Sequence, residues 1–115
     1  MKIAFTSKGP EMDSMMDPRF GRSEYILVLD TKDSSLMVYD NRAISKEAHG
    51  AGPKTAQKLF DFGAEVLITG NGPGGNALSV LEKAGIEIFV GAGDMIVKEA
   101  FEAYSNNQLK TYGKN

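Results

Sequence analysis

Two arginines lie close together in the stretch Arg19-Phe20-Gly21-Arg22. A guanidinium group stays charged at every physiological pH and offers a planar fork of N–H donors. Such forks bind anionic groups through charge-assisted hydrogen bonds. The same spacing is also typical of a solvated loop in which Phe20 packs into the core. The pair therefore indicates either an anion-binding loop or an ordinary surface loop.

The chain has one histidine, His49, and no cysteine. A neutral imidazole can bind a metal ion, and a protonated one can pair with an anion. One histidine without cysteine does not make a tight zinc site, which normally takes three or four protein ligands. His49 is therefore a candidate single metal ligand or anion contact, or a plain surface residue. The lack of cysteine excludes disulfides, thiolate catalysis and cysteine-held iron–sulfur clusters.

Gly-x-Gly pairs occur three times, each before a segment with helical spacing. The pairs are Gly50 with Gly52, Gly70 with Gly72, and Gly91 with Gly93. A helix N-terminus presents free N–H groups and a partial positive charge, and glycine lets a ligand approach the backbone. Each pair alone also fits a tight strand-to-helix turn. Three such entrances on one edge favour binding of a multiply charged anion.

Residues 70–75 also match the G-x-G-x-x-G pattern, but a dinucleotide site needs an acidic residue at the end of the next strand. That strand ends at Val90 without one, and Asp94 lies beyond it in another glycine turn. Pro53 separates Gly52 from Lys54, which excludes a Walker A loop. A nucleotide- or phosphate-binding module that uses the 70–75 turn is the alternative function.

The composition is that of a single globular domain over residues 1–115. Hydrophobic residues make up 42% and charged residues 24%, which are ordinary values. The net charge of −2 lacks the basic excess of general nucleic-acid binders. No apolar run approaches the roughly 20 residues that span a bilayer. We therefore expect a cytoplasmic protein without nucleic-acid or membrane partners.

Apolar runs predict five strands, at residues 3–5, 25–29, 36–39, 66–68 and 86–90. Helices are predicted from residue 53, from the 70–75 turn and from the 91–94 turn. The first three strands follow one another without helices, so they are antiparallel, whereas the later helices require right-handed crossovers to parallel neighbours. The predicted class is α/β, with a mixed sheet of order 3-2-1-4-5 and helices on both faces. We expect the polar tail from about residue 105 to be loosely ordered.

This topology brings four loops to one edge of the sheet, at residues 7–22, 41–52, 70–75 and 91–94. In open α/β sheets, ligands bind outside the carboxyl ends of the strands, where the strand order reverses. The arginines, His49 and the glycine pairs all lie in these loops. Met12, Met15 and Met16 lie there too, and they either line a binding surface or pack beneath the loop.

Four motifs, taken in order, resemble the dinitrogenase iron–molybdenum cofactor biosynthesis family, which includes NifX, NafY and the C-terminal part of NifB. The resemblance covers nearly the whole chain. Its motifs are the Arg19–Arg22 loop before an aromatic strand, His49-Gly50-Ala51-Gly52-Pro53, Gly70-x-Gly72-Pro73, and Gly91-Ala92-Gly93 followed by Val97-x-Glu99-Ala100-Phe101. It implies a ribonuclease H-like, three-layer α/β/α domain with a five-stranded sheet.

The resemblance also implies a function, which is non-enzymatic binding or carriage of an anionic metal–sulfur cluster or its precursor. The cluster would contain molybdenum, iron or both and would be held transiently. His49 and Gly50 match the family's histidine–glycine motif, and Arg19 and Arg22 match its arginine loop. Cluster donor and acceptor proteins are the implied partners of a monomer or weak homodimer. The absence of cysteine departs from members that use thiolates.

A small hydrolase related by fold alone is the remaining alternative. Ribonuclease H-like nucleases need several convergent acidic residues to hold divalent metal ions. The first strand ends with Thr6 and Ser7 and the fourth with Thr69 and Gly70, so neither end carries a carboxylate. We therefore expect that the protein is not an enzyme.

Overall fold

Each apolar run of the sequence forms a strand, and the strands join into one sheet in a computed structural model that describes residues 1–113. The strands are β1 (Lys2–Ser7), β2 (Tyr25–Asp30), β3 (Ser35–Asp40), β4 (Val66–Ile68), β5 (Glu87–Val90) and β6 (Lys110–Tyr112). The helices are α1 (Arg42–Ser45), α2 (Ala51–Asp61), α3 (Gly75–Lys83) and α4 (Val97–Ser105).

The strand order is β3-β2-β1-β4-β5-β6, which confirms the predicted order and extends it by one strand. β2 is antiparallel to both β1 and β3, whereas β4 is parallel to β1 and β5. The prediction of five strands is wrong. Residues 110–112 belong to the tail that was expected to be loose, and they pair antiparallel with β5. Residues 114 and 115 of that tail lie outside the described residues.

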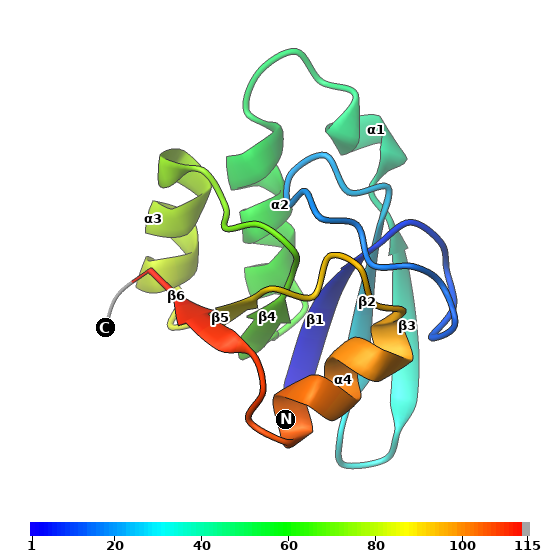
Figure 1. Ribbon diagram of the computed structural model, residues 1–115. Helices are drawn as coiled ribbons and strands as arrows, with labels where there is room; N and C mark the ends of the chain where they lie inside the picture. The colour runs from blue at the N-terminus through cyan, green and yellow to red at the C-terminus, as the bar shows by residue number, and fades with distance from the viewer. Residues whose placement is uncertain (114–115) are drawn as a thin grey trace.

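Two apolar cores lie on opposite faces of the sheet, because successive residues of a strand point to opposite sides. Leu59 of α2 and Leu81 of α3 pack with Ala4 of β1 in one core. Val97 of α4 packs with Phe5 of β1 in the other. Figure 1 shows α2 and α3 together on one face and α4 on the other. The three-layer α/β/α arrangement is therefore confirmed, and the ribonuclease H-like label stays a prediction.

One helix begins later than predicted. α4 begins at Val97 rather than at the 91–94 glycine turn. Ala92 is fully buried, and the Met95 N–H donates to its carbonyl at 3.1 Å, which closes a turn before the helix. Residues 91–96 are therefore a loop. None of the described helices is long and apolar enough to cross a bilayer.

The strand directions bring four loops to the same edge, where β1, β3, β4 and β5 end. We call this edge the carboxyl rim; it consists of residues 8–24, 41–50, 69–74 and 91–96. The rim loops contact one another directly: the Asn71 N–H donates to the Pro18 carbonyl at 2.7 Å, and the Gly91 N–H to the Gly70 carbonyl at 3.0 Å. The predicted convergence of loops is thus present.

Candidate functional site

Fully buried polar side chains gather at the carboxyl rim. Among the described residues they are Thr6, Ser7, Asp17, Ser23, Asn41, Thr55 and Thr69. Each lies at a strand end, in a rim loop or in the first turns of α2. A buried polar group is costly unless it is hydrogen-bonded, so their contacts define how the loops are held.

Thr6 joins the first rim loop to β4. Its Oγ1 donates to the Asp17 carbonyl at 2.7 Å and lies 2.8 Å from Oγ1 of Thr69, just after β4. The Asp17 N–H returns a bond to the Thr6 carbonyl at 2.9 Å. These contacts fix where the loop leaves the sheet, immediately before Arg19.

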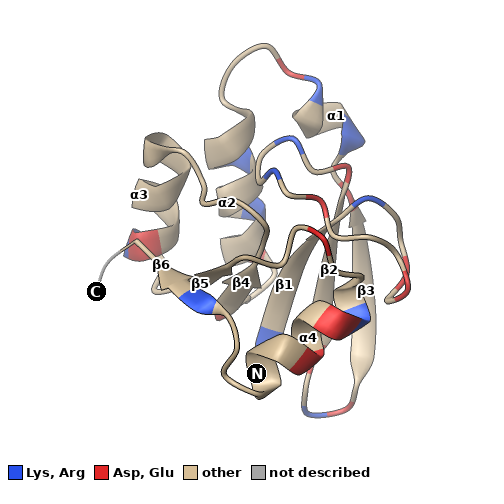
Figure 2. Ribbon diagram, viewed as in Figure 1, with Lys and Arg blue, Asp and Glu red and all other residues tan. Residues whose placement is uncertain are grey.

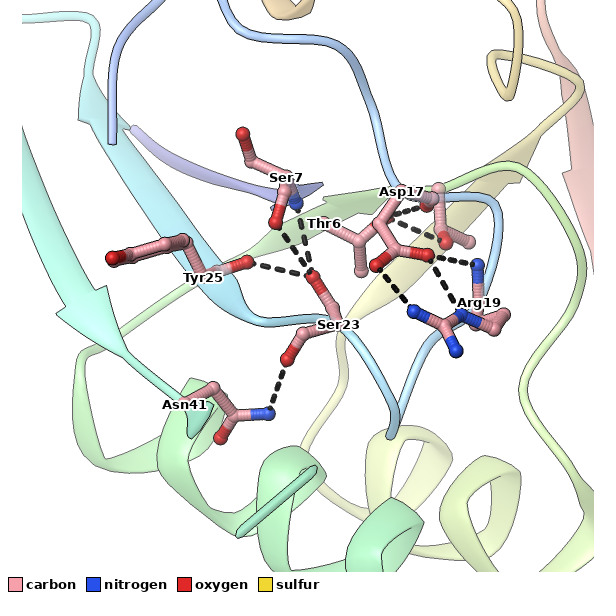
Figure 3. A network of polar contacts seen from close by, with 8 residues as sticks. Thr6, Ser7, Asp17, Arg19, Ser23, Tyr25 and Asn41 are labelled. Atoms are coloured by element: carbon pink, nitrogen blue, oxygen red, sulfur yellow. Dashed lines mark hydrogen bonds and ion pairs between the residues drawn. The ribbon is translucent and has the colours of Figure 1, made fainter. Parts of the chain in front are cut away.

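Ser23 and Asn41 hold the other half of the rim. Ser23 Oγ accepts the Ser7 N–H at 3.0 Å and donates to the Tyr25 carbonyl at 2.7 Å. Asn41 Nδ2 donates to the Ser23 carbonyl at 3.0 Å and to Thr55 Oγ1 at 3.1 Å. Figure 3 shows Ser23 between Ser7 and Asn41, which ties β1 to the end of β3. Through Thr55 the network also reaches α2.

Arg19 is oriented by the buried carboxylate of Asp17. Asp17 Oδ1 accepts the Arg19 backbone N–H at 2.9 Å and its Nε at 3.1 Å, and Oδ2 accepts Nη2 at 3.1 Å. These hydrogen bonds raise the pKa of Arg19. The Arg19 side chain is 58% exposed, and the contacts use its Nε and Nη2 side. Both N–H groups of Nη1 and the second N–H of Nη2 therefore remain for a ligand (Figure 3).

Arg42 repeats this arrangement at the end of β3, and sequence reasoning missed it. Asp40 Oδ1 accepts the Arg42 backbone N–H at 3.0 Å and Nε at 2.9 Å, and Oδ2 accepts Nη2 at 2.7 Å. These bonds lower the pKa of Asp40 to about 2 and raise that of Arg42. The guanidinium carbon lies 5.3 Å from the centre of the Tyr25 ring. The signal was the Asp-x-Arg spacing, which occurs at both 17–19 and 40–42.

Arg22 supports the segment that carries His49. Its Nη1 donates to the carbonyls of Ser45 at 2.7 Å and Glu47 at 2.6 Å. Glu47 also forms an ion pair with Lys54 of α2. His49 follows two residues after Glu47 and is exposed, directly before α2. The two predicted residues therefore belong to one substructure, in which Arg22 shapes the backbone leading to His49.

α2 and α3 begin side by side. A Cβ placed on Gly52 would lie 3.2 Å from the Ala77 Cβ, so the first turns of the two helices are in contact. Gly21 packs over this point, because its Cβ would lie 2.7 Å from the Gly52 Cα. Among residues 1–113, no side chain caps either N-terminus, at Gly50 or at Gly74. Gly21 covers the backbone nitrogen of Gly52, and Pro53 has no N–H, so the exposed first residues of α3, Gly75 and Asn76, carry the more accessible backbone donors beside the arginine loop.

The first turn of α4 is closed, and the prediction that a helix begins at the Gly91–Gly93 turn is wrong, whereas a ligand-binding role of Gly91 and Gly93 stays a prediction. The N–H groups of Val97 and Lys98 donate to the carbonyls of Ser14 and Met12, both at 2.9 Å. Glu99 accepts the Ile96 N–H at 3.1 Å. The first turn of α4 is therefore satisfied within the protein and offers no donors to an anion.

The glycines of the later pairs allow close packing. A Cβ on Gly70 would lie 2.5 Å from the Pro18 Cα, and one on Gly72 would lie 2.1 Å from the Tyr112 ring. Gly72 is thus covered by a side chain of β6. A hollow of about 330 Å³ lies beside it on the rim. It is lined by Pro18, Gly70, Asn71, Gly91, Gly93 and Asp94.

Comparison with known proteins decides the family. Residues 1–107 match the family described as dinitrogenase iron-molybdenum cofactor. The chain belongs to this family. The apo form of the orange protein from Desulfovibrio gigas is 35% identical, with a TM-score of 0.92 over 97% of this chain and 92% of that chain. A Thermotoga protein provisionally named NifB is 34% identical, with a TM-score of 0.83 over 98% and 97%. A search of curated proteins found no match.

In this member of the dinitrogenase iron-molybdenum cofactor family, basic and acidic positions are mixed. Figure 2 shows Lys and Arg positions on α1 and α2 with Asp and Glu positions in the adjoining loops, and both kinds of position on α4. Within residues 1–113, no three His, Asp or Glu side chains are grouped so as to hold a metal ion. The role of His49 as a single metal ligand stays a prediction.

Two of the three methionines in the first rim loop pack against the core, and the third is exposed. Met16 is fully buried and Met12 packs against the same core, on the α4 face of the sheet. Met15 is 43% exposed. Of the two interpretations that the sequence left open, packing beneath the loop holds for Met12 and Met16.

Proposed function

We propose that this chain binds and carries an anionic metal–sulfur cluster, or a precursor of one, without catalysing a reaction. One observation carries the proposal: in a member of this family, the uncapped N-termini of α2 and α3 adjoin beneath the loop of Arg19 and Arg22. The Arg19 guanidinium and the backbone N–H groups at the start of α3 are then the donors that a ligand would meet at this part of the rim, while Arg22 holds the segment that carries His49. Cluster donor and acceptor proteins are the partners that such a carrier requires.

The chemistry of the donors fits transient binding. Hydrogen bonds to charged groups contribute roughly 1.5–3 kcal/mol each. The exposed Arg19 would contribute at the lower end because water screens it. The chain has no cysteine, so a cluster would be held by charge, backbone donors and at most the imidazole of His49. A non-covalent complex of this kind can release its cargo to an acceptor.

The nucleotide or phosphate alternative draws less support from the 70–75 turn. Phosphate loops need glycines whose backbone a ligand can approach. Here Gly70 packs against Pro18, and Gly72 lies under Tyr112. The Asn71 N–H is also used, since it donates to the Pro18 carbonyl.

The relative from Desulfovibrio gigas was solved in an apo form, which supports a binding function.

Retention of a molybdenum–sulfur anion tests the proposal. Tetrathiomolybdate is added anaerobically, the protein is separated by gel filtration, and molybdenum is measured in the protein peak. We expect the wild type to retain molybdenum and the double variant His49→Ala, Arg22→Ala to lose at least about tenfold in affinity, since the imidazole contact is removed and the segment that positions it loses its hydrogen bonds to Arg22. Lys32→Ala is the matched control, because it removes a positive charge in the β2–β3 turn, at the end of the sheet away from the carboxyl rim. Equal retention by wild type and double variant would contradict the proposal.

A further inference from the structure

Asn71 is an exposed asparagine on the carboxyl rim, and a glycine follows it directly. It lies between β4 and α3, outside any helix or strand. Asparagine is one of the thermolabile residues of proteins. Its breakdown begins when the backbone nitrogen of the next residue attacks the side-chain amide carbon. The reaction at Asn71 therefore depends on what holds the nitrogen of Gly72.

The backbone N–H of Gly72 donates no hydrogen bond within residues 1–113. A hydrogen bond would hold the proton and fix the direction of the nitrogen, so its absence leaves the nitrogen free to react. Gly72 also has no Cβ to hinder the approach. Packing explains the glycine, because a Cβ there would lie 2.1 Å from Cζ of Tyr112. The contact with Tyr112 thus favours an unhindered nitrogen directly after Asn71.

The other described asparagines are restrained. Three of them are followed by a backbone N–H that donates a hydrogen bond, namely Asn41, Asn106 and Asn107. The N–H that follows Asn106, for example, donates to the Tyr104 carbonyl at 3.1 Å. Asn76 lies in the first turn of α3 and is followed by Ala77, which is buried and carries a Cβ. Among residues 1–113, only Asn71 combines exposure with a free, unhindered nitrogen behind it.

We propose that Asn71 deamidates spontaneously through a cyclic imide closed by the backbone nitrogen of Gly72. That nitrogen loses its proton to solvent base and bonds to Cγ of Asn71, and the bond from Cγ to Nδ2 breaks as ammonia leaves. Water then opens the ring at either of its two C–N bonds. The product is aspartate or isoaspartate. Overall, one amide and one water become one carboxylate and one ammonium ion.

Deamidation changes the charge of the rim hollow. Asn71 lines this hollow together with Asp94, so the product has two carboxylates there. Both are ionised near neutral pH. The net charge of the chain goes from −2 to −3, because a neutral amide becomes a negative carboxylate. The modified rim repels an anion more strongly, a consequence for binding that rests on the proposed function.

Peptide mapping by mass spectrometry tests the site. The wild type is incubated in mildly alkaline buffer, and deamidation at Asn71 and Asn106 is followed in the same sample by peptide fragmentation. We expect Asn71 to react at least about tenfold faster, which corresponds to about 1.4 kcal/mol in activation free energy. Asn71→Gln should remove the fast reaction, whereas the matched control Asn106→Gln should leave it unchanged. Equal rates at the two sites, or an Asn71 that stays intact, would overturn the proposal.

Unfolding in urea separates the effect of the structure from that of the local sequence. Unfolding releases the N–H that follows Asn106, whereas the N–H of Gly72 has no hydrogen bond to lose. We therefore expect urea to accelerate the reaction at Asn106 more than at Asn71. A larger acceleration at Asn71 would show that the fold protects this residue, and would overturn the proposal.

Retention of tetrathiomolybdate by Asn71→Asp tests the consequence for binding. We expect this variant to retain less molybdenum than the wild type. Asn106→Asp is the matched control, since it adds the same charge at the C-terminus of α4. Equal retention by Asn71→Asp and the wild type would overturn the effect on binding. A wild type that retains no molybdenum would contradict the proposed function, whereas the peptide mapping would still decide whether Asn71 is modified.

Discussion

At the scale of single residues, Arg19 and Arg42 are held by the same arrangement of hydrogen bonds. A carboxylate two residues earlier holds both the backbone N–H and the Nε–Nη2 side of the guanidinium. The side chain is thereby oriented before any ligand arrives, which reduces the entropy lost on binding. The two carboxylates differ in setting, since Asp17 is fully buried and Asp40 is half-exposed.

The pH dependence of Asp40 follows from its bonds to Arg42. Its pKa is lowered from 3.8 to about 2. The unfolded chain therefore takes up the proton first as the pH falls, so the pair stabilises the fold above the ordinary pKa and loses this contribution as the pH falls through about 2. An NMR titration of the side-chain carboxyl should show a midpoint near 2. Arg42→Gln should return the midpoint towards 3.8, whereas Arg19→Gln should leave it unchanged; an unshifted midpoint in Arg42→Gln would contradict this account.

Some residues of the carboxyl rim could be predicted from the sequence, and others could not. Arg19, Arg22 and His49 stood out because their chemistry is recognisable from residue type. The buried network was missed because single Thr, Ser and Asn residues are ordinary in loops. Its signal was positional: Thr6, Thr69 and Asn41 lie at or directly after the carboxyl ends of β1, β4 and β3. Whether such residues are buried depends on which loops fold over them.

At the scale of elements, β6 is the main departure from the prediction. Three residues of mixed polarity give no periodic signal, so 110–112 could not be distinguished from a loose tail. The stretch that matches the family ends at residue 107, before this strand. β6 is anchored by Tyr112, whose ring covers Gly72 and whose hydroxyl lies 3.4 Å from the Pro73 carbonyl.

Removing the Tyr112 ring should loosen β6 and leave the rest of the sheet intact. We expect Tyr112→Ala to lower the free energy of unfolding by about 1–2 kcal/mol, because the ring is only partly buried. Hydrogen exchange should quicken at β6 and in the 70–74 turn but not at β1 or β2. Thr111→Ala is the control, since its exposed side chain lies on the opposite face of the same strand. Faster exchange throughout the sheet would show that β6 is integral to the fold.

The residue at which a helix begins was also harder to predict than the presence of the helix. The glycine turn at 91–94 looked like an entrance because Gly-x-Gly preceded apolar residues at helical spacing. In the structure, α4 begins at Val97, where the first loop supplies carbonyls to its free N–H groups. That contact joins Ser14 to Val97 across more than eighty positions of sequence, and no local pattern encodes it.

At the scale of the whole molecule, topology was predictable because a few strong constraints act together. Three strands without intervening helices must be antiparallel neighbours, and two strand–helix–strand units must cross over to the right. Those rules led to the order of five strands and to the convergence of loops at the carboxyl rim. They do not specify which backbone donors stay free, since that depends on contacts such as those closing α4.

The most direct test of the account is an NMR titration of the chain with tetrathiomolybdate under anaerobic conditions. The central claim is that an anionic metal–sulfur species binds where α2 and α3 begin. The account predicts amide shifts that gather at residues 19–22, 49–52 and 75–77, with smaller shifts in the His49→Ala, Arg22→Ala variant. Shifts confined to the 70–74 turn, shifts on the α4 face, or no shifts at all would contradict it.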